Sequence, residues 1–137
     1  MTLADLVRTD VLTAAPDTPV GDVAAAMRDH GASLVVVLDE GRPVGLLSDA
    51  DLGRAFVAGE DLAARDAASV AADPVTVPVA ADRETLVSTF DAEGVDRVVV
   101  VDDDGDFVGV VTLRDALVRY GRELDAVWTL LESRRTT

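Results

Sequence analysis

The stretch VGLLSDADL at residues 44–52 returns as VGVVTLRDA at residues 108–116, 64 positions later. Upstream, SLVVVLD at residues 33–39 returns as DRVVVVD at residues 96–102 with an offset of 63. One extra acid in the second turn accounts for the change of offset. Because the register holds from residue 11 to 52 and from residue 74 to 116, the chain is an internal duplication of one structural unit.

Each repeat predicts the element order strand, helix, strand, strand, helix. A short extended piece opens it, with Pro nearby that excludes a long central strand. For the following helix we expect Thr18 as the cap with Pro19 at the first helical position, and Asp82 as the cap in the second repeat. Gly31 and Gly94 are expected to end these helices. Valine-rich runs on either side of an acidic, glycine-containing turn then predict a buried hairpin.

Two segments lie outside the repeats. Residues 59–73 are polar and rich in alanine, and predict helical pieces without a strand. After Tyr120, four apolar residues at spacings i, i+3, i+4 and i+7 predict an amphipathic helix that packs on the core or on a second copy: Leu124, Val127, Trp128 and Leu131. We therefore expect a first repeat with an N-terminal helix at 1–65, a second repeat at 66–120, and a C-terminal helix and tail at 121–137.

Composition excludes several classes of protein. The 137 residues contain no cysteine and one histidine, which excludes disulfide scaffolds, thiolate metal sites and cysteine nucleophiles. A net charge of −14 opposes binding to nucleic acid. No apolar run approaches the roughly 18 residues of a membrane span. With no secretory signal visible at the N-terminus, we expect a cytoplasmic location and no membrane partner.

The acidity itself is informative. Twelve basic residues, all arginine, face 26 acids, of which 20 are aspartate. Hydrophobic side chains make up 49% of the chain, which is too many for an acidic disordered protein. Because the Debye length is only about 3 Å at ~1 M salt, such a chain tolerates its own repulsion in concentrated salt. We therefore expect the source to be a halophilic archaeon.

The two repeats resemble a tandem pair of CBS (cystathionine beta-synthase) domains, since each carries Gly, two hydrophobic residues, Ser or Thr, two further residues and Asp before its last helix. The resemblance implies an α/β (α+β) fold in which two pseudo-symmetric repeats pack as one module. It also implies a homodimer, a regulatory role, an unknown protein effector and an adenosine-containing ligand: AMP, ADP, ATP or S-adenosylmethionine. No cofactor is expected to be required.

The resemblance also implies roles for particular residues. Asp51 and Asp115 would bind ribose hydroxyls, because an ionised carboxylate can accept two hydrogen bonds from a vicinal diol. Ser48 and Thr112 would meet the phosphate end, where a helix N-terminus favours an anion. Four residues of the strands would line the base pocket: Thr13, Val35, Thr76 and Val98.

The two expected clefts differ in charge. The second motif carries Arg114, and Arg97 lies on the strand before it, so this cleft suits a phosphate that pairs with an arginine fork. The first motif, SDAD at residues 48–51, holds two carboxylates and no cation. A neutral or cationic adenosine such as S-adenosylmethionine therefore suits it better.

Other interpretations of the same residues remain open. Ser-x-x-Asp and Thr-x-x-Asp are also capping-box patterns, in which hydroxyl and carboxylate serve only the helix. The chain could instead be a ligand-free interaction or dimerisation module that uses its C-terminal helix.

The acidic turn at residues 102–106 favours a plain hairpin over a calcium loop, because an EF-hand alignment on Gly105 puts valine where acids are required. His30 is interpreted as the last residue of a helix. We expect neither an enzyme, since no nucleophile–base pair is visible, nor a metal site.

The charge balance predicts stabilisation by salt. The melting temperature should rise between dilute buffer and about 2 M KCl, because screening removes repulsion among the 26 acidic side chains. Thermal unfolding followed by circular dichroism at several KCl concentrations measures this. An unchanged melting temperature would contradict the halophilic interpretation.

Overall fold

The first repeat folds into a three-stranded sheet with helices around it. The structure is a computed structural model that describes residues 3–58 and 61–135. After a short 3-10 helix, η1 (Leu3–Asp5), the elements of this repeat are β1 (Leu12–Ala14), α1 (Val20–His30), β2 (Leu34–Asp39), β3 (Arg42–Ser48) and α2 (Asp49–Val57). The strand order is β1-β2-β3, with β1 parallel and β3 antiparallel to the central strand.

The second repeat has the same topology. A linker helix, α3 (Ala67–Val70), precedes β4 (Thr76–Pro78), α4 (Arg83–Glu93), β5 (Arg97–Val101), β6 (Phe107–Thr112) and α5 (Leu113–Arg135). The strand order is β4-β5-β6, again with one parallel and one antiparallel pair. The expected mixed α and β fold with two pseudo-symmetric repeats is therefore confirmed.

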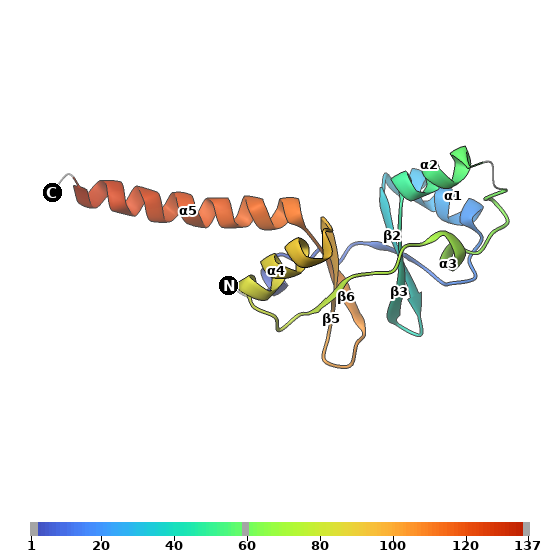
Figure 1. Cartoon of the computed structure of the whole chain (residues 1–137), viewed down its shortest axis with the longest axis horizontal. Coiled ribbons are helices and arrows are strands. Elements are labelled where there is room, and N and C mark those ends of the chain that lie inside the picture. Colours follow the sequence, from blue (N-terminus) through green and yellow to red (C-terminus); the bar gives the residue numbers. More distant parts are fainter. Residues whose placement is uncertain (1–2, 59–60, 136–137) are drawn as a thin grey trace.

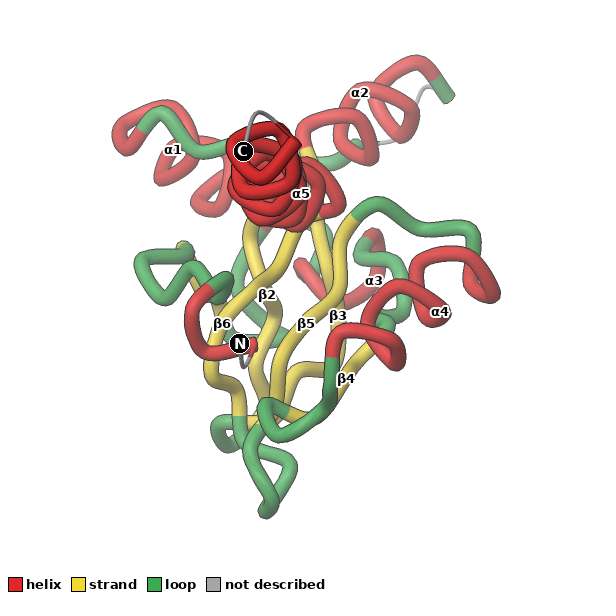
Figure 2. The backbone as a smooth tube through the Cα atoms, turned by 90° about the vertical axis from the view of Figure 1, so that its left-hand side faces the viewer, coloured by secondary structure: helices red, strands yellow, loops and turns green. Residues whose placement is uncertain are grey.

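The two sheets lie against each other, with α1 and α3 outside one sheet and α4 outside the other (Figures 1 and 2). Two apolar clusters fill the space between each sheet and its own helices. Val36 and Val99, at the centres of β2 and β5, belong to neither cluster and are still fully buried. Because side chains alternate along a strand, these valines face the opposite repeat, and the module has one continuous interior.

Each segment leading into one repeat pairs with the last strand of the other. Arg8 exchanges two backbone hydrogen bonds with Val110 of β6, with N···O distances of 2.9 and 3.0 Å. Ala72 does the same with Leu46 of β3, at 2.8 and 2.9 Å. The N-terminal segment also sends Leu3 into the apolar cluster of the second repeat. The repeats are thus joined by a reciprocal exchange of backbone.

The glycine of each repeated motif makes room for these segments. A Cβ on Gly109 would lie 2.3 Å from the carbonyl oxygen of Arg8, and a Cβ on Gly45 would lie 2.8 Å from the Cβ of Ala71. Both distances are shorter than any ordinary contact. The motif glycines are therefore required by the fold itself.

The start of α1 differs from the expectation. The prediction that Thr18 caps this helix is wrong: Pro19 occupies the capping position and no side chain bonds to the helix end. The backbone N–H of Val20 instead donates to the carbonyl of Arg65, at 2.9 Å. The linker between the repeats satisfies the free end of the helix, so a side-chain cap is not needed.

The other predicted helix ends are confirmed. The Asp82 carboxylate accepts the N–H of Thr85 at 2.8 Å and caps α4. Gly31 and Gly94 end α1 and α4 with φ of 62° and 63°, in the left-handed region that favours glycine.

The C-terminal helix is longer than the sequence indicates. The helical segments expected on either side of Gly121 form one helix, α5, which extends away from both sheets (Figure 1). The helix expected at the N-terminus is the single turn η1. Residues 59 and 60 of the predicted helical linker lie outside the described residues. From 61 to 73 the linker contains α3 and, apart from isolated bridges at Asp66 and Ala72, no strand. None of the helices within the described ranges could cross a membrane.

Two glycine substitutions separate crowding from helix propensity. Gly109→Ala should lower the free energy of unfolding by about 1–3 kcal/mol, because the new methyl group meets backbone that cannot move aside. Gly121→Ala, inside α5 with nothing within 4 Å, should raise it by about 0.5–1 kcal/mol. Denaturant titrations of both variants at one KCl concentration measure the difference. Equal midpoints for Gly109→Ala and the unsubstituted chain would contradict the close approach at Arg8.

Candidate functional site

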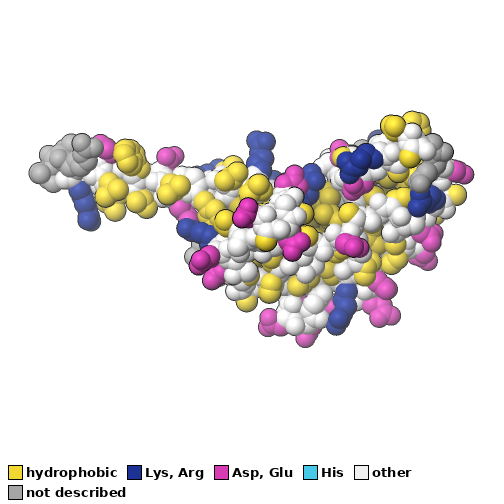
Figure 3. Space-filling model, viewed as in Figure 1, with side chains coloured by type: hydrophobic (Ala, Val, Ile, Leu, Met, Phe, Trp, Pro, Cys, Tyr) yellow, Lys and Arg dark blue, Asp and Glu magenta, His cyan; other side chains and the backbone are white. Residues whose placement is uncertain are grey.

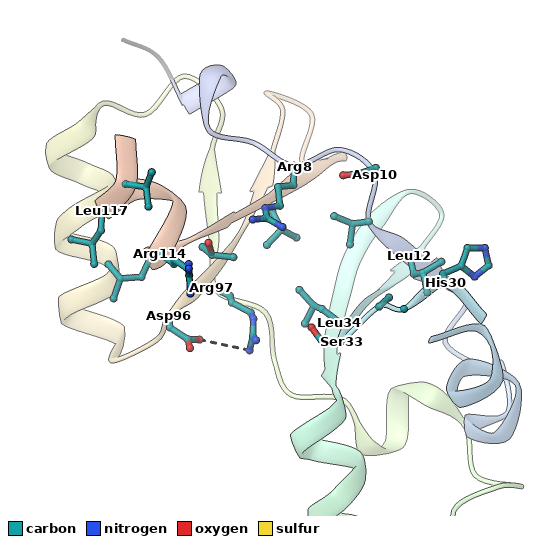
Figure 4. A pocket seen from close by; sticks show the side chains of 17 residues that line it. Arg8, Asp10, Leu12, His30, Ser33, Leu34, Asp96, Arg97, Arg114 and Leu117 are labelled. Atoms are coloured by element: carbon teal, nitrogen blue, oxygen red, sulfur yellow. Dashed lines mark ion pairs between the residues drawn. The ribbon is translucent and has the colours of Figure 1, made fainter. Parts of the chain in front are cut away.

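A cleft of about 890 Å³ opens between the two repeats beside the start of α5. We call it the Thr112 cleft. Among the residues that line it are three arginines, Arg8, Arg97 and Arg114, and two aspartates, Asp10 and Asp96. Figure 4 shows the three guanidinium groups on one side of the cleft, across from Leu12 and His30. The cleft therefore carries an excess of positive side chains in a chain of charge −14.

The rest of this cleft is largely apolar. Its apolar lining comes from both repeats and from α5: Val11, Leu12, Leu34, Val110, Leu113, Leu117 and Val118. Leu34 and Leu12 lie at the starts of β2 and β1, so the cleft opens at the ends of these strands. A cavity with cations on one wall and aliphatic side chains on the other suits a ligand with an anionic end and a flat apolar end.

A second cleft, of about 700 Å³, adjoins the first and shares four lining residues with it: Leu34, Asp96, Arg97 and Leu113. We call it the Ser48 cleft, and Ser48 and Asp51 both line it. Its charged lining consists of two arginines and three aspartates: Arg54, Arg97, Asp51, Asp73 and Asp96. Arg97 and Leu34 line both clefts. The Ser48 cleft therefore has an excess of negative side chains, as the sequence indicates.

The ion pair of Arg8 with Asp115 distinguishes the two clefts further. Arg8 donates from Nε and Nη2 to the two carboxylate oxygens of Asp115, at 2.6 and 2.8 Å. At the equivalent place in the Ser48 cleft, 64 positions later, the residue is Ala72. Only the Thr112 cleft therefore has a cation that reaches in from the exchanged segment.

This pair changes the electrostatics of the motif aspartate. The Arg8 guanidinium, followed by the Thr112 hydroxyl, holds the pKa of Asp115 below its ordinary value, while burial opposes the shift. The carboxylate is thus ionised at neutral pH, as a hydrogen bond to a diol requires. Because the folded-state pKa is lowered, the pair contributes stability above the ordinary pKa, and this is lost as the pH falls through the lowered pKa.

Thr112 caps α5 without a complete capping box. Its hydroxyl accepts the backbone N–H of Asp115 at 3.0 Å. The Asp115 carboxylate is bound to Arg8 and lines a separate hollow of about 340 Å³. Arg8 lines both this hollow and the Thr112 cleft. Arg8 therefore stands between the motif carboxylate and the open cleft.

Ser48 and Asp51 form a full capping box. The Ser48 hydroxyl accepts the N–H of Asp51, and the Asp51 carboxylate accepts the N–H of Ser48, both at 3.1 Å. The same carboxylate pairs with Arg54, one turn along α2. The capping interpretation of this motif is confirmed, and it leaves Asp51 engaged on two sides.

The four residues expected to line a base pocket are not brought to either cleft. Thr13 and Val35 line a separate hollow of about 270 Å³ under α1. Val98 is fully buried in the cluster beneath α4, and Thr76 is exposed on β4. The clefts open at the strand starts, where Leu12 and Leu34 lie, whereas Val35 and Val98 point into the interior of their own repeats. The apolar wall thus comes from neighbouring residues.

Arg8 is the residue that the sequence analysis missed. It precedes residue 11, where the recognised register of the repeat begins. Extending the offset of 64 by three residues would align Arg8 with Ala72 and mark both as the residue that pairs with the opposite repeat. The interpretation of His30 as the last residue of a helix is confirmed. Its Nδ1 lies 2.9 Å from the carbonyl of Ala26, and its exposed side chain lines the Thr112 cleft.

The acidic turn between β5 and β6 serves its own backbone. Asp102 Oδ1 accepts the N–H groups of Asp104 and Asp106, both at 2.9 Å. Carboxylate oxygens of these three residues lie within 4.8 Å of one another. The turn also meets the opposite hairpin, since Phe107 N–H donates to the carbonyl of Gly41 at 2.9 Å. The hydrogen bonds are those of a hairpin turn, and exposed carboxylates alone do not define a metal site.

Comparison with known families agrees with this architecture. The family model described as the CBS domain matches residues 3–58 and 64–121. A solved structure of the CBS domain of the bacterial CNNM/CorC family Mg2+ transporter in complex with ATP is similar, with a TM-score of 0.75 and 27% identity. The match covers 85% of this chain and 84% of that one.

Two curated relatives are longer than this chain. An uncharacterized protein of Methanopyrus kandleri is 31% identical over 124 residues, which cover 85% of this chain and 61% of the relative. Inosine-5'-monophosphate dehydrogenase of Methanocaldococcus jannaschii is 31% identical over 116 residues, which cover 84% of this chain but only 23% of the enzyme.

Proposed function

Because the chain belongs to the CBS domain family, we propose that it is a regulatory module that binds an adenosine-containing ligand in the Thr112 cleft. The observation that carries this proposal is the gathering of Arg8, Arg97 and Arg114 around one cleft of a chain with a charge of −14. Arginine forks bind phosphate with two hydrogen bonds each. Thr112 and the N-terminus of α5 offer further donors beside them.

The remaining parts of an adenosine ligand also find suitable surroundings. The apolar wall around Leu12 and Leu34 accommodates an adenine ring. Asp115 lies in the adjoining hollow that Arg8 also lines, and it would supply an ionised carboxylate for the ribose. The volume of about 890 Å³ falls within the usual range of small-molecule sites. The similar CBS domain of the Mg2+ transporter is in complex with ATP, which supports a nucleotide as the ligand here.

We assign a weaker role to the Ser48 cleft. Asp51 is engaged by the capping box and by Arg54, and the charged lining is more acidic than basic. A polyphosphate is repelled there, so S-adenosylmethionine is the ligand that suits this cleft. Ser48 and Asp51 would then contact its ribose end.

Binding would act on the arrangement of the two repeats, because the Thr112 cleft is lined from both. A ligand at 100 times its dissociation constant stabilises the state that binds it by about 2.7 kcal/mol. That is enough to shift a balanced equilibrium between two arrangements about a hundredfold if only one of them binds. The shift would be passed to a protein effector or to a second copy of the chain.

We propose no catalytic role, and no required cofactor, for this module. Its likeness to the dehydrogenase of M. jannaschii covers 23% of that enzyme, so dehydrogenase activity does not transfer with it. We also propose that the module acts in a halophilic cytoplasm, where salt would screen its charge of −14.

Thermal unfolding with candidate ligands tests the assignment. In about 2 M KCl, millimolar AMP, ADP or ATP should raise the melting temperature, since ligand binding to the folded state adds stability. Asp115→Ala should abolish the rise for these nucleotides, because it removes the carboxylate that meets the ribose. Asp51→Ala is the matched control, since it deletes the same group from the Ser48 cleft.

The outcomes separate the two clefts. A nucleotide shift that survives Asp115→Ala and disappears with Asp51→Ala would reverse the ranking. No shift with any nucleotide or with S-adenosylmethionine would contradict ligand sensing as a whole.

A second candidate function is favoured by α5. Beyond Glu123 this helix leaves the body of the module, and its apolar residues are exposed, with Leu124 at 70% and Trp128 at 63% (Figure 3). Leu117, Leu124 and Leu131 recur every seven residues, with Val127 between the last two. Such a stripe is typical of a helix that pairs with another helix. We therefore propose that α5 carries a dimerisation or partner contact, either alongside ligand binding or in its place.

Substitution on the apolar stripe tests this second role. The double variant Leu124→Gln, Leu131→Gln should lower the molar mass in solution from dimer to monomer, because two positions of the apolar seam become polar. Sedimentation velocity measures the mass, and Thr129→Gln, on the opposite face of α5, is the control. A monomer before any substitution would contradict pairing between copies of this chain.

A further inference from the structure

Arg8 joins three features of the molecule that are otherwise separate. Its backbone is fixed to β6 by the two hydrogen bonds with Val110. Its side chain donates hydrogen bonds to both carboxylate oxygens of Asp115. The same side chain lines the Thr112 cleft together with Arg97 and Arg114. The Ser48 cleft has no equivalent, since Ala72 occupies the matching place in the exchanged segment.

We propose that Arg8 selects for phosphorylated ligands by exchanging partners: without a ligand it holds Asp115, and it releases Asp115 to the ribose when a phosphate of the same ligand binds its guanidinium. This inference rests on the proposed function, because it concerns the ligand of the Thr112 cleft. It adds a determinant of specificity from outside the repeated motif.

The exposure of the Arg8 side chain and its place on two hollows favour such an exchange. The Arg8 side chain is 60% exposed and that of Asp115 is 23% exposed, so the guanidinium can turn about its side-chain bonds. Arg8 already lines both the cleft and the hollow that holds Asp115. Figure 4 shows its guanidinium directed into the space that it shares with Arg114. A phosphate bound there would compete with the carboxylate for the same fork.

The strength of the pair suits a reversible contact. Ion pairs between exposed side chains typically change an equilibrium by about fivefold or less, and the Arg8 side chain of this pair is 60% exposed. A ligand whose phosphate binds the guanidinium can therefore break the pair. Adenosine would have to break the Arg8–Asp115 ion pair to reach the carboxylate. Because adenosine has no phosphate, it would give the Arg8 guanidinium no new partner. A nucleotide would replace the broken ion pair by binding its phosphate to the Arg8 guanidinium. This contact is a charge-assisted double hydrogen bond, so it compensates for the interaction with Asp115 that is lost.

Adenosine and ATP, titrated separately by calorimetry, form the test pair. For Arg8→Ala we expect adenosine to bind up to about fivefold more tightly, because Asp115 is no longer occupied. We expect ATP to bind about tenfold more weakly, because one fork to the phosphates is lost. The preference for ATP over adenosine should therefore fall by at least about tenfold.

The controls separate this exchange from a general effect of charge. Arg28→Ala removes a positive charge from α1, where Arg28 pairs with Asp29 and lines neither the Thr112 cleft nor the hollow of Asp115, and it should leave the preference unchanged. Arg8→Lys keeps the charge without the fork and should give an intermediate preference. Arg8→Gln repeats the test should Arg8→Ala disturb folding.

Failure of this inference can be told from failure of the proposed function. If ATP binds in a manner abolished by Asp115→Ala, and Arg8→Ala leaves the preference for ATP unchanged, the exchange is overturned and the nucleotide site stands. A fall in the preference that Arg28→Ala reproduces would equally overturn it. If neither ligand binds the unsubstituted chain, both proposals fall together.

Discussion

Two pairs of backbone hydrogen bonds, between Arg8 and Val110 and between Ala72 and Leu46, determine how the repeats are joined. Each pair attaches the segment that leads into one repeat to the last strand of the other, so neither repeat is complete alone. The motif glycines, Gly45 and Gly109, exist because these segments approach too closely for a Cβ. The two clefts are a consequence, since they open beside the crossing segments and between the two repeats.

The same crossing makes the clefts unequal. An arginine in one exchanged segment and an alanine in the other give the Thr112 cleft a third cation and leave the Ser48 cleft acidic. The helix-capping motif is shared, yet its carboxylate has different partners: Asp51 completes a capping box, whereas Asp115 binds Arg8. A duplicated sequence has thereby acquired two chemically different sites, of which the cationic one suits a nucleotide.

Most of the fold could be predicted from the repeat, because element order, helix ends at Gly31 and Gly94, and the hairpins depend on local sequence. Thr18 was wrongly assigned as a cap because a distant carbonyl, that of Arg65, meets the helix end instead. The charge difference between the clefts could be foreseen from Arg97 and Arg114, since both lie within the repeated units. The residues that form the apolar lining of the clefts could not be predicted from the repeat, because strand register decides which side chains reach a cleft. Arg8 was missed because its role depends on a pairing about 100 residues away along the chain.

The central claim is that a nucleotide binds between the repeats at the Thr112 cleft. Titration of isotope-labelled protein with ATP, followed by amide resonances in two-dimensional NMR spectra, tests it most directly. The account predicts the largest shifts at residues that line this cleft and not the other, at Arg8, Leu12 and Thr112, with small changes at Ser48 and Asp51. Shifts concentrated at Ser48 and Asp51, or no shifts at saturating ATP, would contradict it.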